Sequence, residues 1–286
     1  ARSAGCPAAP ALLHRHPAEA ARHPHPAPVR QGRRRLGAGV RAEPRHRRAR
    51  LPGHRAGYSL GQFAFKAGKT YTKTVNTAVF GPHVGKNLGL FRDGNQIFGS
   101  LPLFADSGRH AGYSDFTSVR TTLYRNGAKV GSNDDPLFGD KTFKVPAGDA
   151  AYRLTTTVKR SAAVAKATSR IDATWTFRSK LARDFTQLPA SALHFGAATG
   201  LDSRVDAGKK VTFPVTVEGS AAGGNLKSLA VYVSYDGKTW KKADVRGGGI
   251  TVKNPAKGKS VSFRAKITDK KGNTSQITIH DAYFGK

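Results

Sequence analysis

The segment Leu229–Val245, LAVYVSYDGKTWKKADV, predicts a β-hairpin and sets the pattern for most of the chain. Large apolar residues occupy every second position in its first half, and this period of two places one set of side chains on a buried face. Asp236-Gly237 then supplies residues that tolerate positive φ, as a tight turn requires, and we expect Trp240 to open the returning strand. The apolar set is Leu229, Val231, Val233 and Tyr235.

Short strand-like segments of this kind continue from residue 58 onward, so the predicted fold class is all-β with two tandem antiparallel β-sandwiches. We expect the first, jelly-roll-like sandwich over residues 58–180. Leu181–Ala192 breaks the alternation and is interpreted as a linker. Residues 193–286 hold a series of short strands within about a hundred residues, which is typical of an immunoglobulin-like sandwich.

Two features inside these regions make the expectation more specific. Ile171, Ala173, Trp175 and Phe177 should face the first core, and Val261, Phe263, Ala265 and Ile267 should face the second. Leu90–Phe98 and Leu123–Gly131 also predict matching hairpins, with turns at Asp93-Gly94 and Asn126-Gly127. Two hairpins with similar flanks indicate an internal duplication.

Residues 1–57 differ in composition from the rest. They contain Ala, Arg, Pro, His and Gly, with no aromatic residue and only two Val as β-branched residues, so they cannot bury enough surface to offset their ordering entropy. We therefore expect a disordered basic tail. The abrupt change at Tyr58 also resembles out-of-frame translation of a GC-rich gene, and Arg45–Arg50 is the alternative of a phosphate-binding arm.

Charge, cysteine and hydropathy limit the function classes. The formal net charge is +30, of which the region after residue 57 carries +19, mostly as Lys at outward strand positions and in turns. A solvated β surface explains this distribution, with binding of an anionic polymer as the alternative and nucleic acid as a more remote one. The single cysteine, Cys6, allows no disulfide framework, and no apolar run is long enough to span a bilayer. Because the sequence begins with Ala and contains no Met, we interpret it as a processed or truncated product.

No catalytic constellation is evident. Gly57–Gly61 matches the G-x-S-x-G pattern of a nucleophile elbow, but no β/α alternation surrounds Ser59, so a chance match is the interpretation. His83, His110, His194 and His280 are the histidines outside the tail. Asp115 lies near His110 in sequence and Asp281 adjoins His280, but neither pair has a nucleophile beside it.

One loop is a candidate metal site. Asn133, Asp134, Asp135 and Asp140 place three carboxylates and an amide within eight residues. Calcium takes several oxygen ligands from such a loop. The alternative is a simple turn, because Asn, Asp and Pro136 form turns and Lys141 compensates the charge. No other cofactor site is predicted.

Ser234–Trp240 is similar to the Asp-box of sialidases, S-x-D-x-G-x-T-W, with one residue missing. In those proteins the box is a structural hairpin, so a single shortened copy supports a hairpin rather than a sialidase. Tyr58, Tyr113, Tyr124 and Trp240 are aromatic residues that could stack on sugars; the alternative is core or cross-strand packing.

Three stretches carry a resemblance to a known family: Tyr152–Phe177, Leu188–Ser191 with Ala197–Arg204, and Leu229–Trp240. Together they resemble the C-terminal, non-catalytic region of large secreted subtilisin-like serine proteases of actinobacteria. The resemblance extends from about Tyr58 to Lys286, and the ending Ala282–Lys286 looks like a natural C-terminus.

The resemblance implies an accessory region that stabilises or positions a protease domain, in a secreted protein, with that domain as its partner. The catalytic motifs of the family do not carry over, because the chain has no Met for G-T-S-M-A and no His before Gly-Thr. We therefore expect no enzymatic activity from this chain. The alternative function is a free-standing module that binds cell-wall glycan or an anionic envelope polymer.

Overall fold

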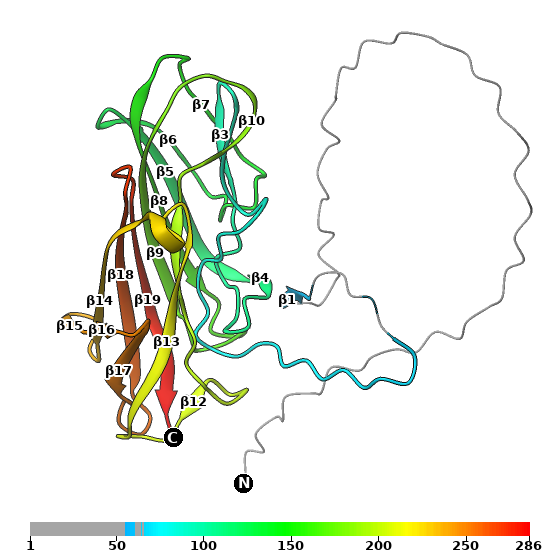
Figure 1. Cartoon of the computed structure of the whole chain (residues 1–286), viewed down its shortest axis with the longest axis vertical. Coiled ribbons are helices and arrows are strands. Elements are labelled where there is room, and N and C mark those ends of the chain that lie inside the picture. The colour runs from blue at the N-terminus through cyan, green and yellow to red at the C-terminus, as the bar shows by residue number, and fades with distance from the viewer. Residues whose placement is uncertain (1–54, 61–63, 65) are drawn as a thin grey trace, which may run out of the picture. The chain divides into compact units, whose positions relative to one another are not determined.

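The computed structural model describes residues 55–60, 64 and 66–286, which all belong to one compact unit (Figure 1). The predicted tail therefore lies outside the described residues, except for its last three. Ala56 and Gly57 belong to a strand, so the ordered region begins before the boundary predicted at residue 58.

Antiparallel strands form nearly all the regular structure of these residues, which confirms the all-β fold class. The longest sheet is ordered β15-β14-β18-β19-β9-β8-β5-β6, with β12 added in parallel beside β19. Its strands are β5 (Phe116–Arg125), β6 (Ala128–Asn133), β8 (Ala150–Arg160), β9 (Arg170–Ser179), β12 (Arg204–Val205), β14 (Leu226–Ser234), β15 (Lys241–Ala243), β18 (Ser260–Asp269) and β19 (Thr274–Gly285).

Two four-stranded sheets and a two-stranded ribbon complete the unit. The first sheet is ordered β10-β2-β3-β7, with β2 (Gly89–Gly94), β3 (Gln96–Ser100), β7 (Phe143–Lys144) and β10 (Ala182–Leu188). The second is ordered β11-β13-β17-β16, with β11 (Ser191–Phe195), β13 (Lys210–Gly219), β16 (Val245–Arg246) and β17 (Gly249–Lys253). The ribbon pairs β1 (Ala56–Ser59) with β4 (Ala111–Ser114), and a single 3₁₀ turn, η1, covers Gly223–Asn225.

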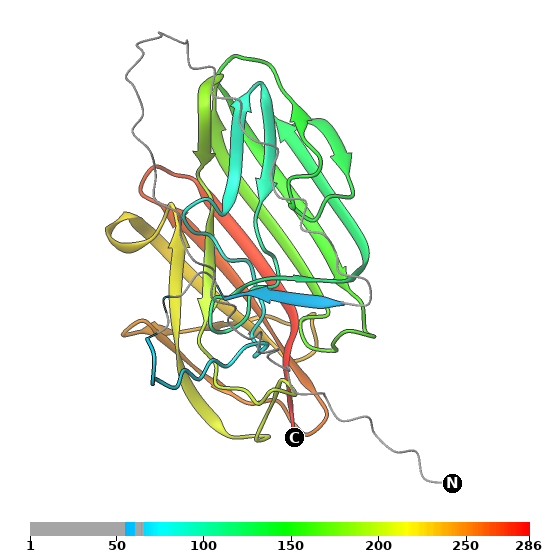
Figure 2. The same cartoon turned by 90° about the vertical axis from the view of Figure 1, so that its right-hand side faces the viewer.

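Both four-stranded sheets pack on the same face of the long sheet (Figures 1 and 2). Phe195 of β11 stacks on Phe263 of β18 with ring centroids 4.8 Å apart. Arg92 of β2, which is fully buried, donates to the Ser179 hydroxyl of β9 at 3.2 Å. The registers place Phe263 opposite Ile279, and Ile279 opposite Ile171, so the buried side chains of β18, β19 and β9 share one face.

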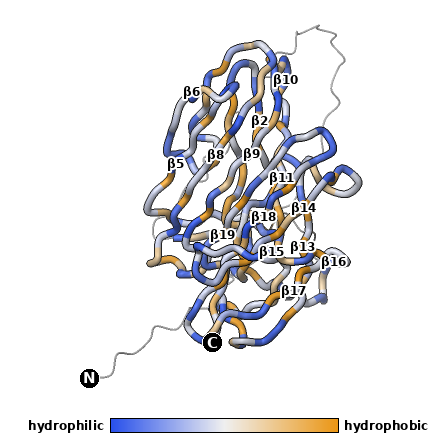
Figure 3. The backbone as a smooth tube through the Cα atoms, turned by 90° about the vertical axis from the view of Figure 1, so that its left-hand side faces the viewer, coloured by the Kyte–Doolittle hydropathy of each residue, from blue (hydrophilic) through white to orange (hydrophobic). Residues whose placement is uncertain are grey.

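The predicted alternation is confirmed in the strands that carry the core. Ile171, Ala173, Trp175 and Phe177 are all buried, as are Val261, Phe263, Ala265 and Ile267. The outward residues between them are polar, and Figure 3 shows hydrophilic and hydrophobic residues alternating along β8, β9, β18 and β19.

The predicted division into two domains needs correction. Residues 181–192 are not an open linker, because they contain β10 and the start of β11, which pair with β2 and β13. β9 from the first region and β19 from the second pair over seven residues, from His280↔Arg170 to Thr274↔Thr176. The physical reason is that, without this pairing, β9 and β19 would each be an edge strand. Two long open edges would then expose unpaired backbone N–H and C=O groups. Two sandwich-like halves therefore share one continuous sheet.

The opening hairpin differs from its prediction in the loop. Val231 and Val233 are buried, but Tyr235 lies beyond the end of β14 and is 48% exposed. Val233 pairs with Lys241, so the returning strand begins after Trp240 and the loop is longer than a two-residue turn. Gly237 has a φ of 71°, as the prediction of a positive φ required.

The two matching hairpins also form. Asn126-Gly127 is the two-residue turn between β5 and β6, with φ values of 48° and 85°. In the other hairpin Asp93 pairs with Gln96, so the turn residues are Gly94 and Asn95, one position later than predicted.

Candidate functional site

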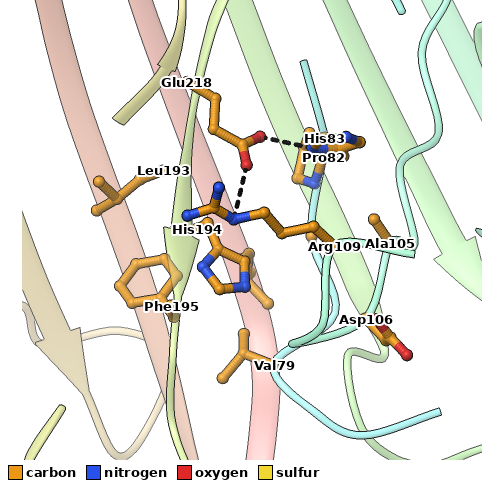
Figure 4. Close-up of a pocket in the computed structure, with 12 residues that line it drawn as sticks. Val79, Pro82, His83, Ala105, Asp106, Arg109, Leu193, His194, Phe195 and Glu218 are labelled. Carbon is orange, nitrogen blue, oxygen red and sulfur yellow. Dashed lines mark hydrogen bonds and ion pairs between the residues drawn. The ribbon is translucent and has the colours of Figure 1, made fainter. Parts of the chain in front are cut away.

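A small pocket lies where the segment before β2 and the loop before β4 meet β11 and β13 (Figure 4). His83 comes from the segment before β2, and Arg109 comes from the loop before β4. His194 lies in β11 and Glu218 lies near the end of β13. His83 and His194 are candidates from the sequence, but their association with Arg109 and Glu218 was not predicted. The reason is that these four residues come from distant parts of the chain.

Glu218 organises the pocket. Its side chain is only 7% exposed, and Oε2 accepts hydrogen bonds from His83 Nδ1 at 2.9 Å and from the Val84 backbone N–H at 3.1 Å. Oε1 is buried without a hydrogen bond, at 3.4 Å from the Arg109 Nε atom with which it forms an ion pair. A buried carboxylate needs such partners, since an isolated buried charge is strongly unfavourable. These contacts join both loops to β13.

His194 makes the other polar contact at this junction. Its Nε2 atom donates to the Ser107 carbonyl oxygen at 2.7 Å. Burial lowers the pKa of His194 because removal from water disfavours the imidazolium, an effect that the Ser107 hydrogen bond opposes. A neutral His194 fits the role of a fixed hydrogen-bond donor to the loop.

The adjoining loop is held by Asp106, whose side chain is fully buried. Its carboxylate accepts from the backbone N–H groups of Asn76, Gly108 and His110 and from His110 Nδ1 at 3.0 Å. The carboxylate partner of His110 is therefore Asp106, and not Asp115 as sequence proximity suggested.

The partner of His280 is also a residue distant in sequence. His280 Nε2 lies 2.8 Å from Asp172 Oδ2 on the neighbouring strand, whereas the adjacent Asp281 binds the hydroxyls of Ser169 and Ser260. Thr157 donates to the other oxygen of Asp172 at 2.8 Å, and Arg170 Nε donates to Oδ2 at 2.9 Å.

No hydrogen bond in the described part of the chain joins a histidine ring to a Ser, Thr or Cys side chain. Gly57, Tyr58 and Ser59 of the G-x-S-x-G match lie in β1, an antiparallel strand paired with β4, and Gly61 lies outside the described residues. The strand-to-helix turn that a nucleophile elbow needs is therefore not formed at Ser59.

The residues of the predicted calcium loop make separate contacts. Asp135 is 5% exposed, and its carboxylate accepts hydrogen bonds from the backbone N–H groups of Phe138, Gly139 and Lys141. Asp134 is turned to Lys141 on the surface. Among the described residues, no group of three or more His, Cys, Asp or Glu side chains is arranged to hold a metal ion. Asn133 uses its side-chain oxygen to accept the Asp135 N–H at 3.1 Å, and calcium binding at this loop stays a prediction.

The pKa values of these two carboxylates are shifted in opposite directions. Burial raises the pKa of Asp135, although its three backbone hydrogen bonds oppose the effect. The hydrogen bond from Lys141 lowers the pKa of the exposed Asp134.

The Asp-box-like segment forms a closed loop. Asp236 Oδ1 accepts from the backbone N–H groups of Lys238 and Thr239, each at 2.7 Å, and from the Ser234 hydroxyl at 2.9 Å. These backbone hydrogen bonds hold the pKa of Asp236 far below its usual range. The loop places the Trp240 ring 4.0 Å from the Arg264 guanidinium of β18.

Another cation is buried beside β1. Arg160 is 5% exposed, donates to the Ser114 hydroxyl and the Ala167 carbonyl, and lies 4.5 Å from the centre of the Phe80 ring. Burial raises the pKa of the neighbouring Tyr58 to about 12, an effect that Arg160 opposes. These groups fix the β1–β4 ribbon to β8.

The outward face of the long sheet, opposite its core residues, carries polar and charged side chains. In the sequence, Lys and Arg at outward strand positions look scattered. The registers align them in rows across the sheet. One row runs Lys242, Tyr232, Arg264, Thr278, Asp172, Thr157 and Arg120. The alternation within each strand was visible in the sequence, but the strand order that builds the rows was not.

No helix in the described part of the chain is long and apolar enough to cross a membrane. No family model and no curated protein matches the chain. Among solved structures, it is similar to fibronectin(III)-like modules of Clostridium thermocellum CbhA, at 13% identity and a TM-score of 0.22, covering 71% of this chain and 94% of that one. It is also similar to three N-terminal domains of the bacteriophage RB49 highly immunogenic outer capsid protein, at 12% identity and a TM-score of 0.23, covering 70% of this chain and 57% of that one.

Proposed function

We propose that this chain is a non-catalytic accessory region of a secreted subtilisin-like serine protease, and that it acts through binding and stabilisation. The resemblance of Tyr152–Phe177 and Leu229–Trp240 to such regions motivates the assignment. In the parent protein the protease domain would be its partner.

The observation that carries the non-catalytic part is the set of histidine contacts. His83 and His110 are bound to carboxylates, His194 to a carbonyl oxygen, and His280 to Asp172 and Arg170. A serine or cysteine nucleophile needs a base within hydrogen-bond reach. In the described part of the chain, no histidine ring forms that pair with a Ser, Thr or Cys side chain.

The test is active-site labelling of the purified chain. A fluorophosphonate probe should label no serine, and hydrolysis of casein and of p-nitrophenyl acetate should equal that of buffer alone. A matched Ser59→Ala variant serves as the control for surface reaction. Stoichiometric labelling that disappears in Ser59→Ala would overturn the proposal.

A second candidate is a free-standing module that binds an anionic envelope polymer or a cell-wall glycan. The row of cations on the outward face of the long sheet favours it. Sequencing the gene upstream of the codon for Tyr58 separates the two candidates. An in-frame subtilisin-type domain supports the accessory role, and a different in-frame domain or a start codon supports the free-standing module.

A further inference from the structure

We infer that the outward face of the long sheet binds an anionic polysaccharide, an inference that rests on the proposed role as a binding module. The face is built by the side chains that alternate with the core residues of β5, β6, β8, β9, β14, β15, β18 and β19. Strands in a sheet lie about 4.8 Å apart, so the face from β5 to β18 is about 19 Å wide.

Cations gather at both sides of this face. The β8 cation cluster consists of Arg120, Lys129, Arg153 and Lys159, from β5, β6 and β8. The β18 cation cluster consists of Lys242, Arg264 and Lys266, from β15 and β18. Since β8 and β18 are separated by β9 and β19, about 14 Å lies between the clusters.

Hydroxyl and amide groups occupy the middle of the space between the clusters, and Arg170 and Arg178 lie near the two ends of β9 on the same face. The hydroxyl and amide groups are those of Thr174 and Thr176 of β9 and Thr274, Gln276 and Thr278 of β19. Asp172 is the one carboxylate that the registers place among these described rows, and it is already bound by Thr157, Arg170 and His280. The uncompensated charge of the face is therefore positive.

Three of these cations, Arg153, Arg264 and Lys266, lie over aromatic rings. Arg153 lies 4.2 Å from the centre of the Tyr124 ring, and Lys266 lies 5.5 Å from that of Tyr232. Arg264 lies over Trp240 and donates from Nε to the Thr278 hydroxyl at 3.1 Å. A guanidinium fixed in this way keeps its terminal nitrogens for a carboxylate or sulfate, and loses little freedom on binding.

This arrangement favours an acidic polysaccharide over a nucleic acid. Single-stranded nucleic acids are bound by aromatic rings on which bases stack. The rings of Tyr124, Tyr232 and Trp240 each already carry a cation over one face. A sugar polymer with repeated anionic groups and hydroxyls matches two cation clusters joined by a band of threonines.

The test compares dextran sulfate with uncharged dextran, which share a backbone, and adds poly(dT) as the nucleic-acid arm. Two variants each remove two charges: Arg264→Gln with Lys266→Gln, and Arg120→Gln with Lys159→Gln. The control is Lys210→Gln with Lys253→Gln, an exposed cross-strand pair on the sheet that packs against the other face. Circular dichroism checks that all variants are folded.

We expect the wild-type chain to bind dextran sulfate and not dextran, with affinity falling at least tenfold between about 50 and about 200 mM salt. Each face variant should weaken binding about tenfold, whereas the control should change it less than about twofold.

Several results would overturn the inference. These are an equal loss in the control variant, no binding to dextran sulfate, or tighter binding to poly(dT) than to dextran sulfate. The readout is independent of the labelling test above. A labelled serine would defeat the non-catalytic proposal without changing these affinities, and a failure to bind would leave the labelling result intact.

Discussion

At the scale of single residues, two glycines separate the effect of a positive φ on stability from the effect of close neighbouring atoms. Gly219 and Gly237 have similar positive φ values, 81° and 71°. A Cβ atom on Gly237 would meet nothing within 4 Å, whereas on Gly219 it would lie 2.0 Å from the Ala190 carbonyl oxygen. A side chain at Gly237 would be disfavoured only by the backbone conformation. A side chain at Gly219 would also clash with Ala190, where the chain enters β11.

We therefore expect Gly237→Ala to lower the free energy of unfolding by about 1–2 kcal/mol, from the left-handed conformation alone. Gly219→Ala should lower it by about 3–5 kcal/mol, because the clash adds to the same strain. Urea denaturation of the two variants gives both values. Equal losses would show that the Ala190 contact relaxes without penalty.

At the scale of elements, the loop between β6 and β7 is held by hydrogen bonds to one of its carboxylates. Asp135 binds three backbone N–H groups of its own loop, and the Thr121 hydroxyl of β5 donates to the Asp135 carbonyl oxygen. The loop is thus attached to β5 by Asp135, while Asp134 stays on the surface.

Asp135→Ala should destabilise the protein by about 2–3 kcal/mol, because it leaves backbone N–H groups without their acceptor. Asp134→Ala is the matched control and should change stability by less than about 0.5 kcal/mol, as expected for an exposed ion pair. Thermal melts with millimolar calcium or with a chelator should coincide for the wild-type chain. A clear rise of the melting temperature in calcium would instead confirm the calcium-loop prediction.

At the scale of the whole described unit, the pairing of β9 with β19 decides how the protein unfolds. Buried apolar residues from both halves belong to one contiguous core. Trp175 of β9 is fully buried and donates from Nε1 to the Ser191 carbonyl at 3.0 Å. It therefore contacts the start of β11, which directly follows the short connection from β10. Phe263 of β18 is equally buried, among the rings of Phe195, Phe213 and Tyr283.

We expect calorimetry to show one unfolding transition, because the two halves share a sheet and a core. Trp175→Phe in the first half and Phe263→Leu in the second should each lower the temperature of that same transition, at a cost of about 1–3 kcal/mol. Two transitions, of which each substitution moves only one, would support the separate domains that the sequence predicted.

The sequence by itself determined the fold class and the inward-facing residues of the central strands. The reason is that strand alternation is local: the period of two in Ile171–Phe177 and Val261–Ile267 is set by the backbone of each strand and needs no partner. Turn chemistry is local too, so Asn126-Gly127 and the positive φ of Gly237 followed from the residues.

Only the tertiary structure decided which strands become neighbours. The union of the halves through β9 and β19, the pairing of His280 with Asp172 and the convergence of His83, Arg109 and Glu218 join residues far apart in the chain. The cation face depends on the same information. Each strand shows its own outward Lys or Arg, but strand order and register place Arg264, Lys266, Arg120 and Lys159 on one surface, because side-chain rows across a sheet are set by hydrogen bonding between strands.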